Sequence, residues 1–182
     1  MSSSGLRVNF DDVRAAIRDV PDFPKKGIVF KDITTLWQDK EGFKRSVDDM
    51  AAYYKDNDIK IDKIIGAEAR GFVIGAALAY ALGVGFIPVR KKGKLPYDVI
   101  EEEYALEYGT DVLQIHTDAI TKGEKILVVD DLIATGGTCH AIANLIKRLG
   151  GEIAGFAFLV ELEFLKGIEQ LEDYSVFSLI KF

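Results

Sequence analysis

The chain has 182 residues, of which 48% are hydrophobic and 29% charged, and these values are typical of one soluble globular domain, here expected over residues 1–182. The net charge of −6 at pH 7 argues against a nucleic-acid-binding protein, because surfaces that bind nucleic acid are usually basic. Cys139 is the only cysteine, so no intrachain disulfide can form, and the N-terminus lacks signal-peptide features, which together favour a cytoplasmic protein.

The first part of the chain predicts two helices separated by a loop and a short strand. Apolar residues at helical spacing predict an amphipathic helix over Phe10–Val20, which Pro21 ends. Residues 21–27 contain two prolines and a glycine and are typical of a loop, whereas Ile28–Phe30 predicts a short strand. A second amphipathic helix is expected over Glu41–Tyr54.

A long uncharged run follows the next predicted strand, Lys63–Gly66. The run, Phe72–Val89, is just long enough to suggest a membrane span, but Gly83, Gly85 and Pro88 interrupt it. We therefore expect a buried helix to Leu82 and a buried strand over Phe86–Val89. Arg70 and Arg90 lie at the two ends of this run and are candidate functional residues. The loop before the helix is a second possible anion site.

Residues 97–108 and 111–116 differ in character from the rest of the chain. They alternate in polarity, with Gly109 between them, and this pattern predicts an antiparallel hairpin that is partly solvated and lies outside a parallel core. A long polar excursion between core strands is a candidate lid, which we place at about residues 95–111.

The stretch Lys125–Thr138 predicts a strand, two acids, a glycine loop and the start of a helix. The apolar run Ile126–Val129 is typical of a strand buried on both faces, with Asp130 and Asp131 at its end. A helix start offers free amides and partial positive charge to a phosphate, and glycines let the backbone approach it. Paired carboxylates beside such a cradle would accept hydrogen bonds from sugar hydroxyls. The combination indicates a ribose 5-phosphate site; the alternative is an ordinary strand–turn–helix with capping threonines.

Two more strands complete the predicted fold, one over Glu152–Leu162 and one over Ser175–Ile180. Strands that alternate with helices predict an α/β fold with a mainly parallel sheet flanked by helices.

Several motifs resemble those of one protein family. Residues Val128–Thr138 resemble the phosphoribosyl-pyrophosphate motif of the type I phosphoribosyltransferases. Further stretches resemble the adenine-specific branch of that family, namely Phe23–Ile33, Gly66–Phe72, Arg90–Pro96, Tyr104–Gly109 and Leu159–Leu162. The resemblance implies the type I phosphoribosyltransferase fold, with a small N-terminal hood at about residues 21–36.

The resemblance also implies a purine-salvage reaction, in which adenine and phosphoribosyl pyrophosphate give AMP and pyrophosphate through an oxocarbenium-like transition state. It implies Mg²⁺ as cofactor, bridging substrate oxygens with no certain direct protein ligand, and a homodimer in which Arg90 reaches the neighbouring site. No nucleic acid and no membrane are expected as partners.

Roles follow by resemblance at each matching position. Catalysis is assigned to Glu107, Asp130, Asp131 and Arg70, with Glu107 exchanging a proton with adenine N7. The 5-phosphate and ribose are assigned to Asp130, Asp131, Ala134, Thr135, Gly136, Gly137 and Thr138. Pyrophosphate is assigned to Ala69, Arg70, Arg90, Lys91 and Lys94. Adenine is assigned to Val29, Phe30, Lys31 and Leu162, with main-chain groups of Val29 and Lys31 reading its edge.

Some alternatives stay open on the sequence alone. Arg90–Lys94 could be a solvated basic turn, Phe30 plain core and Glu107 one more surface acid. Lys31 stands where relatives commonly carry arginine, which leaves only a side-chain role in doubt. Two rival functions remain. One is a sensor of phosphoribosyl pyrophosphate that binds nucleic acid, and the other is an enzyme of the same fold that acts on another base.

Overall fold

The computed structural model describes residues 11–105 and 109–182. The chain divides into two compact units, of which the first ends at Ser46 and the second spans Val47–Phe182. The lid residue Glu107 lies outside the described residues, and the expected single domain stays a prediction.

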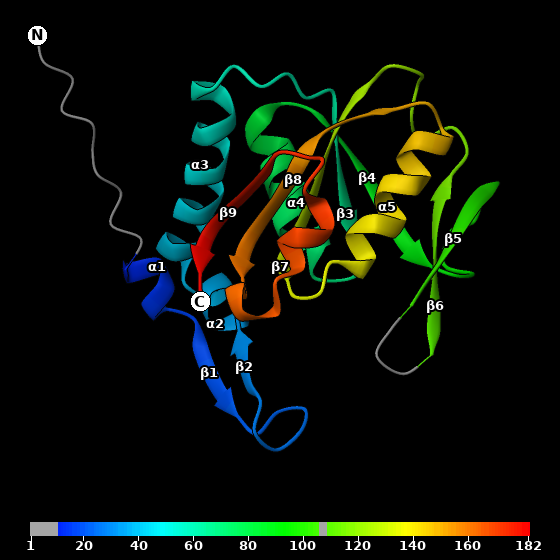
Figure 1. Ribbon diagram of the computed structural model, residues 1–182. Coiled ribbons are helices and arrows are strands. Elements are labelled where there is room, and N and C mark those ends of the chain that lie inside the picture. Colours follow the sequence, from blue (N-terminus) through cyan, green and yellow to red (C-terminus); the bar gives the residue numbers. More distant parts are fainter. Residues whose placement is uncertain (1–10, 106–108) are drawn as a thin grey trace, which may run out of the picture. The chain divides into compact units, whose positions relative to one another are not determined.

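The first unit contains a two-stranded antiparallel sheet and short helices (Figure 1). Its elements are α1 (Asp11–Ala15), β1 (Arg18–Pro21), β2 (Val29–Asp32), α2 (Thr34–Gln38) and the first residues of α3 (Lys40–Asp56). α3 bears out the helix predicted over Glu41–Tyr54.

The helix predicted over Phe10–Val20 is wrong in its second half. Val13 and Ile17 are buried, as the amphipathic pattern predicts, but α1 ends at Ala15 and β1 begins at Arg18. β1 pairs with β2, and Arg18 Nη2 lies 2.5 Å from Asp32 Oδ2 across this pair. Lys31 Nζ likewise lies 2.6 Å from an Asp19 carboxylate oxygen. These partners lie far away in sequence, so helical periodicity could not reveal them.

The second unit is built on a seven-stranded sheet in the order β5-β6-β4-β3-β7-β8-β9. Its strands are β3 (Lys63–Ala67), β4 (Gly85–Lys91), β5 (Val99–Ala105), β6 (Thr110–His116), β7 (Lys125–Ile133), β8 (Glu152–Glu161) and β9 (Val176–Lys181). Its helices after α3 are α4 (Gly71–Leu82), α5 (Gly137–Arg148) and the short 3-10 helices η1 (Glu163–Leu165) and η2 (Gly167–Leu171). β3, β4, β7, β8 and β9 pair in parallel, which confirms the predicted mainly parallel α/β sheet.

The order of the strands fixes where a ligand can bind. From β3 the chain crosses through α4 to β4 on one side, and from β7 it crosses through α5 to β8 on the other side. Right-handed crossovers in opposite directions place the two helices on opposite faces of the sheet. The carboxyl ends of β3 and β7 therefore form a topological switch point, where open α/β sheets bind ligands.

The core explains the uncharged runs of the sequence. All four side chains of Ile126–Val129 are 0% exposed, and burial of each such side chain stabilises the fold by roughly 1.5–3 kcal/mol. The run Phe72–Val89 forms α4 and most of β4, as predicted. Across residues 11–105 and 109–182, no helix has the length and apolar character needed to cross a membrane.

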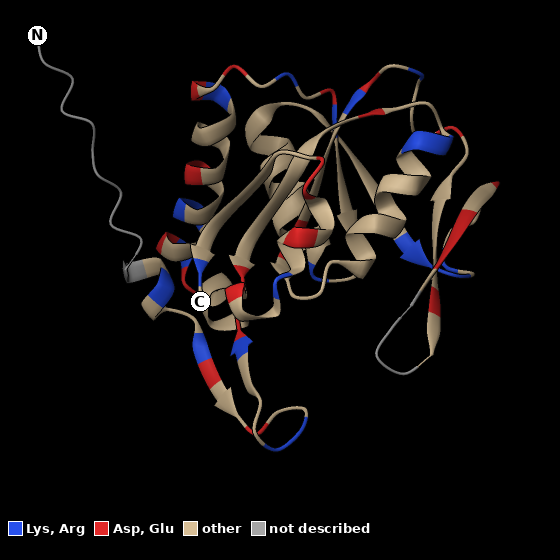
Figure 2. Ribbon diagram, viewed as in Figure 1, with Lys and Arg blue, Asp and Glu red and all other residues tan. Residues whose placement is uncertain are grey.

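The hairpin β5–β6 is antiparallel, as predicted, but it is attached to the sheet. β6 pairs with β4 through Arg90–Gln114 and Lys91–Leu113. On α5, Asn144 Nδ2 donates a hydrogen bond of 2.9 Å to Glu102, and Arg148 Nη1 lies 3.1 Å from the same carboxylate. Figure 2 shows the acidic stretch of β5 and the basic C-terminal end of α5. The hairpin that carries the expected lid is thus held by β4 and α5, and movement of the lid stays a prediction.

Candidate active site

A cavity of ≈ 270 Å³ lies at the switch point of the sheet. Its walls come from the loop after β3, the end of β7, the loop that leads into α5, and the side of the hairpin. The lining includes Ala67–Arg70, Tyr104, Leu113 and the whole of Asp130–Cys139. The sequence predicted the last of these stretches as the centre of the site.

The loop between β7 and α5 has the shape of an anion cradle. Gly136 caps α5 with φ +84°, a conformation that favours glycine, and α5 begins at Gly137. The first amides of a helix have no carbonyl partner within it, so they are free to bind an anion. All five residues predicted for the 5-phosphate line the cavity, namely Ala134, Thr135, Gly136, Gly137 and Thr138.

The two acids lie inside β7 rather than after it, because the strand continues to Ile133. Asp131 is 3% exposed, its carboxylate Oδ2 lies 3.0 Å from Arg70 Nε, and its amide donates a hydrogen bond of 2.9 Å to Asp130 Oδ1. Burial and the neighbouring Asp131 charge raise the pKa of Asp130 well above its usual value. Burial also raises the pKa of Asp131, partly offset by Arg70.

Gly71 explains how the acids fit against α4. A Cβ at Gly71 would lie 2.7 Å from Asp130 Oδ1 and 3.2 Å from the carbonyl oxygen of Val129. Only glycine at this position lets the start of α4 approach the Asp130 carboxylate so closely. Arg70 and Gly71 therefore each contact one of the acids: Arg70 lies beside Asp131, and Gly71 lies beside Asp130.

The residues predicted for pyrophosphate divide into two groups. Ala69 and Arg70 line the cavity, whereas Arg90, Lys91 and Lys94 are not among its lining residues. Arg90 donates to both carboxylate oxygens of Glu68 at 3.2 Å, and to the Lys94 carbonyl at 3.1 Å. These hydrogen bonds hold the pKa of Glu68 below its usual value. Glu68 lines the cavity, and the sequence analysis assigned this loop residue no role of its own, because its partner Arg90 lies on β4.

Tyr104 is a second lining residue that the sequence analysis did not assign to the site. Its side chain interacts with Thr138 of the cradle and with Asp111, the residue opposite on β6. Asp111 Oδ2 lies 2.9 Å from Lys91 Nζ, and this pair raises the pKa of Lys91. A polar chain thus runs from the basic end of β4 to the start of α5. The signals in the sequence for Tyr104 were the alternating pattern of β5 and its place at the start of the Tyr104–Gly109 stretch, and neither gave its side chain a role.

The residues predicted for adenine belong to different units. Val29, Phe30 and Lys31 lie on β2 of the first unit, and Leu162 follows β8 in the second. The Phe30 ring packs edge-on against Phe23 with centroids 5.2 Å apart. The Lys31 ammonium pairs with Asp19, which leaves its main chain as the group suited to reading a base. The sandwich of a base between Phe30 and Leu162 stays a prediction, as does the role of Glu107.

Neither a metal cluster nor a reactive thiol is present in the described part of the chain. No group of three or more His, Cys, Asp or Glu side chains there could hold a metal ion. Cys139 is buried, and burial raises the pKa of its thiol, so it packs rather than reacts.

Comparisons with known proteins agree on one family. The model of the phosphoribosyl transferase domain matches residues 37–181. The adenine phosphoribosyltransferase of Syntrophotalea carbinolica is 60% identical over 172 residues, which cover 94% of this chain and 99% of that protein.

Solved structures are similarly close. The crystal structure of adenine phosphoribosyltransferase from Thermoanaerobacter pseudethanolicus is 51% identical with a TM-score of 0.91, over 95% of this chain and 99% of that one. The enzyme from Saccharomyces cerevisiae, crystallised with adenine and an imino-altritol bisphosphate, is 39% identical with a TM-score of 0.89, over 93% and 97% of the two chains.

Proposed function

Because the chain belongs to the phosphoribosyl transferase family, and within it to the adenine phosphoribosyltransferases, we propose that it transfers the 5-phosphoribosyl group to adenine. Adenine and phosphoribosyl pyrophosphate give AMP and pyrophosphate in this purine-salvage reaction. The observation that carries the proposal is that the N-terminus of α5, the half-buried Asp130 and the buried Asp131 line one cavity.

The cradle and the two acids bind different parts of the substrate. The amides at the start of α5 and the hydroxyls of Thr135 and Thr138 bind the 5-phosphate. Asp130 and Asp131 accept hydrogen bonds from the ribose hydroxyls. Arg70, 3.0 Å from Asp131, orients that carboxylate from the pyrophosphate side of the cavity.

The reaction forms a bond from adenine N9 to ribose C1 and breaks the bond from C1 to the pyrophosphate oxygen, which leaves with the electron pair. Positive charge develops at C1 as in glycoside chemistry, so the transition state is oxocarbenium-like. The carboxylates of Asp130 and Asp131 stabilise that charge, and Ala69 and Arg70 receive the leaving pyrophosphate. No protein nucleophile is required.

Mg²⁺ fits these residues only as an ion held chiefly by the substrate. Asp130 and Asp131 give the cavity two carboxylates, and Mg²⁺ commonly binds one or two carboxylates together with substrate phosphates and waters. When bound, it would neutralise charge on the leaving pyrophosphate. The protein's own part is to hold the ribose and phosphates in line.

The base is read by the first unit and the lid in this proposal. Main-chain groups of Val29 and Lys31 recognise the adenine edge, Phe30 and Leu162 sandwich the ring, and Glu107 exchanges a proton with N7. The pairing of Lys31 with Asp19 supports reading by main chain.

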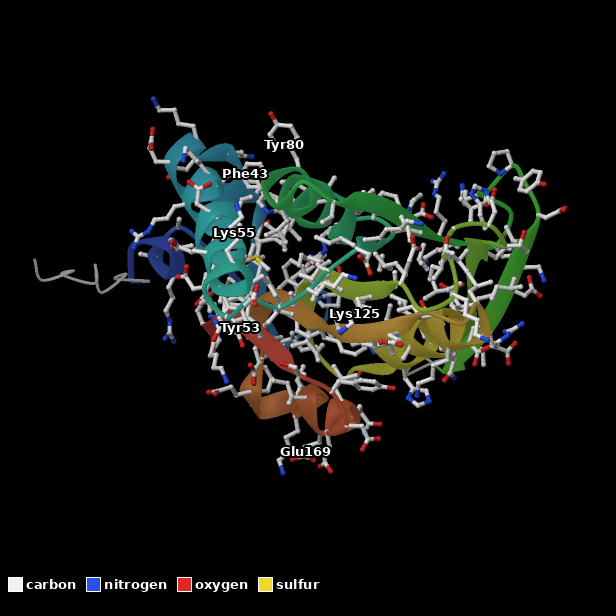
Figure 3. All side chains as sticks on the ribbon, turned by 90° about the horizontal axis from the view of Figure 1, so that it is seen from above. Phe43, Tyr53, Lys55, Tyr80, Lys125 and Glu169 are labelled. Atoms are coloured by element: carbon white, nitrogen blue, oxygen red, sulfur yellow. The ribbon has the colours of Figure 1, made fainter. Side chains whose placement is uncertain are left out.

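We further propose that the protein is a homodimer. Tyr80 is 91% exposed and points away from the sheet on α4, where Val73 is also 40% exposed (Figure 3). Exposed apolar side chains on one helix suit an interface. Arg90–Lys94 does not line the cavity of its own chain, which fits a role at the partner's site.

A base panel tests the function. With Mg²⁺ and phosphoribosyl pyrophosphate, purified protein should use adenine far faster than hypoxanthine, guanine or orotate. A 6-oxo group inverts the hydrogen-bonding pattern at position six, and a mismatched buried amide costs about 1–3 kcal/mol. Equal rates with adenine and hypoxanthine would contradict the proposal.

A further inference from the structure

The outer side of the phosphate cradle rests on the chain segment after β8. A Cβ at Gly136 would lie 2.7 Å from the Gly167 carbonyl oxygen and 3.1 Å from Gln170 Cβ. In return, a Cβ at Gly167 would lie only 2.2 Å from the carbonyl oxygen of Ala134. The two backbones therefore touch at two points, with a glycine on each side, and leave no room for a side chain.

The segment that carries Gly167 is itself fixed. Leu171 at the end of η2 is 1% exposed and belongs to the core, and Ile168 packs against the same core. At its other end, the Leu162 amide donates a hydrogen bond of 3.2 Å to the Ile133 carbonyl. Glu169 points away from the sheet into solvent (Figure 3). The segment therefore has one solvent face and one face against the cradle.

We propose that Gly167 is a positioning residue for the phosphoribosyl site: its backbone, held by Ile168 and Leu171, fixes the Ala134–Gly136 loop in the shape that binds the 5-phosphate. The inference rests on the proposed function, which gives that loop its ligand. Leu162, predicted to contact adenine, begins the same segment, so the base side and the phosphate side of the site share one support.

The substitution Gly167→Ala tests this contact between the two backbones. Gly167 is not among the glycines with positive φ, so alanine is compatible with its backbone dihedral angles. The added methyl group therefore acts only through steric contact with neighbouring atoms. The nearest of these, the Ala134 carbonyl oxygen, is more than 1 Å closer than ordinary contact allows. The loop must shift by a distance of that order, and displacements of about 1 Å in a binding site can change rates by about 10²-fold.

The test compares Gly167→Ala with wild type and two matched glycine variants. Steady-state kinetics with adenine should show a rise of about tenfold or more in KM for phosphoribosyl pyrophosphate, with a smaller change in kcat. Calorimetry should show a similar loss of AMP affinity.

Two control variants separate loop position from stability. Gly85→Ala, whose nearest neighbour would be the flexible Lys63 Cγ at 3.2 Å, should bind AMP like wild type. Gly151→Ala would press on Ile120 and Ile146 at 2.9 and 3.0 Å, so it should lower the Tm without changing AMP affinity below that temperature.

A third variant covers the case in which Gly167→Ala does not fold. Ile168→Ala loosens η2 without adding an atom, and should raise the same KM about two- to fivefold. Wild-type AMP affinity in folded Gly167→Ala overturns the inference. If Gly167→Ala is unfolded, unchanged AMP affinity in Ile168→Ala overturns the inference. Equal losses of AMP affinity in Gly167→Ala and Gly151→Ala also overturn it. Failure of wild type to bind AMP overturns the proposed function itself.

Discussion

Asp130 has a raised pKa and a role in the proposed chemistry, and Asp130→Asn should separate its effect on stability from its effect on activity. Asparagine keeps the size of the side chain and the oxygen that accepts the 2.9 Å hydrogen bond from the Asp131 amide. It removes a carboxylate whose pKa is raised by burial and by the charge of Asp131. The variant therefore no longer places an ionisable carboxyl group beside Asp131 at this half-buried position.

The sign of the pH dependence follows from the raised pKa. The folded protein binds the Asp130 proton more tightly than the unfolded chain does, so the contribution of Asp130 to stability is greatest below the ordinary pKa of 3.8. That contribution decreases as the pH rises toward the folded pKa. Asp130→Asn should therefore be more stable than wild type at pH 7–8, and the difference should shrink toward pH 4.

The expected gain is about 0.5–2 kcal/mol, the usual range for relief of one unfavourable feature. For a chain of this length it corresponds to a Tm increase of about 1–8 °C. Activity should change in the other direction. Each charge-assisted hydrogen bond to a ribose hydroxyl is worth about 1.5–3 kcal/mol, so kcat/KM should fall by about 10–10²-fold for each one lost.

Thermal unfolding without ligand between pH 4 and 8 and steady-state kinetics with adenine measure the two effects. Asp131→Asn is the matched comparison, because Arg70 Nε, 3.0 Å from the Asp131 carboxylate, offsets part of the burial effect on the pKa of Asp131, so the gain in stability should be smaller than for Asp130→Asn. A variant Asp130→Asn that is less stable than wild type at pH 8 would refute the reasoning, as would a gain that does not shrink toward pH 4.

Two further predictions concern the lid and the partner subunit. Glu107→Gln should lower kcat by about 10²–10⁴-fold with little loss of phosphoribosyl pyrophosphate affinity, because an amide cannot exchange a proton with adenine N7; nearly full kcat in single-turnover experiments would leave Glu107 as a surface acid. Arg90→Ala mixed with Asp131→Asn should regain activity that neither has alone, if Arg90 acts in the neighbouring site of a dimer. A fully active monomer in sedimentation would exclude that role.

The sheet and the cradle could be predicted because their signals are local. The run Ile126–Val129 is apolar throughout since both faces of β7 are covered, and the glycines after it mark the helix start. Parallel strands bring their carboxyl ends to one edge of the sheet, where the loops after β3 and β7 can meet. One cavity indeed contains both.

Features that depend on contacts between distant residues could not be predicted. The pairing of Arg18 and Asp19 with β2 replaced the second half of the predicted helix by a strand. Glu68 and Tyr104 became lining residues only once β4 and the hairpin were placed. Gly167 could not be singled out from the sequence, because the Ala134 carbonyl that excludes its side chain comes from a loop more than 30 residues earlier.

The acidic run of β5 also has a consequence for solubility. β5 is the outermost strand of the seven-stranded sheet, and an edge strand with free amides invites another copy of the chain to extend the sheet. Glu101, Glu102 and Glu103 place three carboxylates in a row on this edge strand, and only the first two have basic partners within the described residues. Two copies of β5 would bring like charges together, which disfavours edge-to-edge aggregation, and salt would weaken this protection by screening the repulsion.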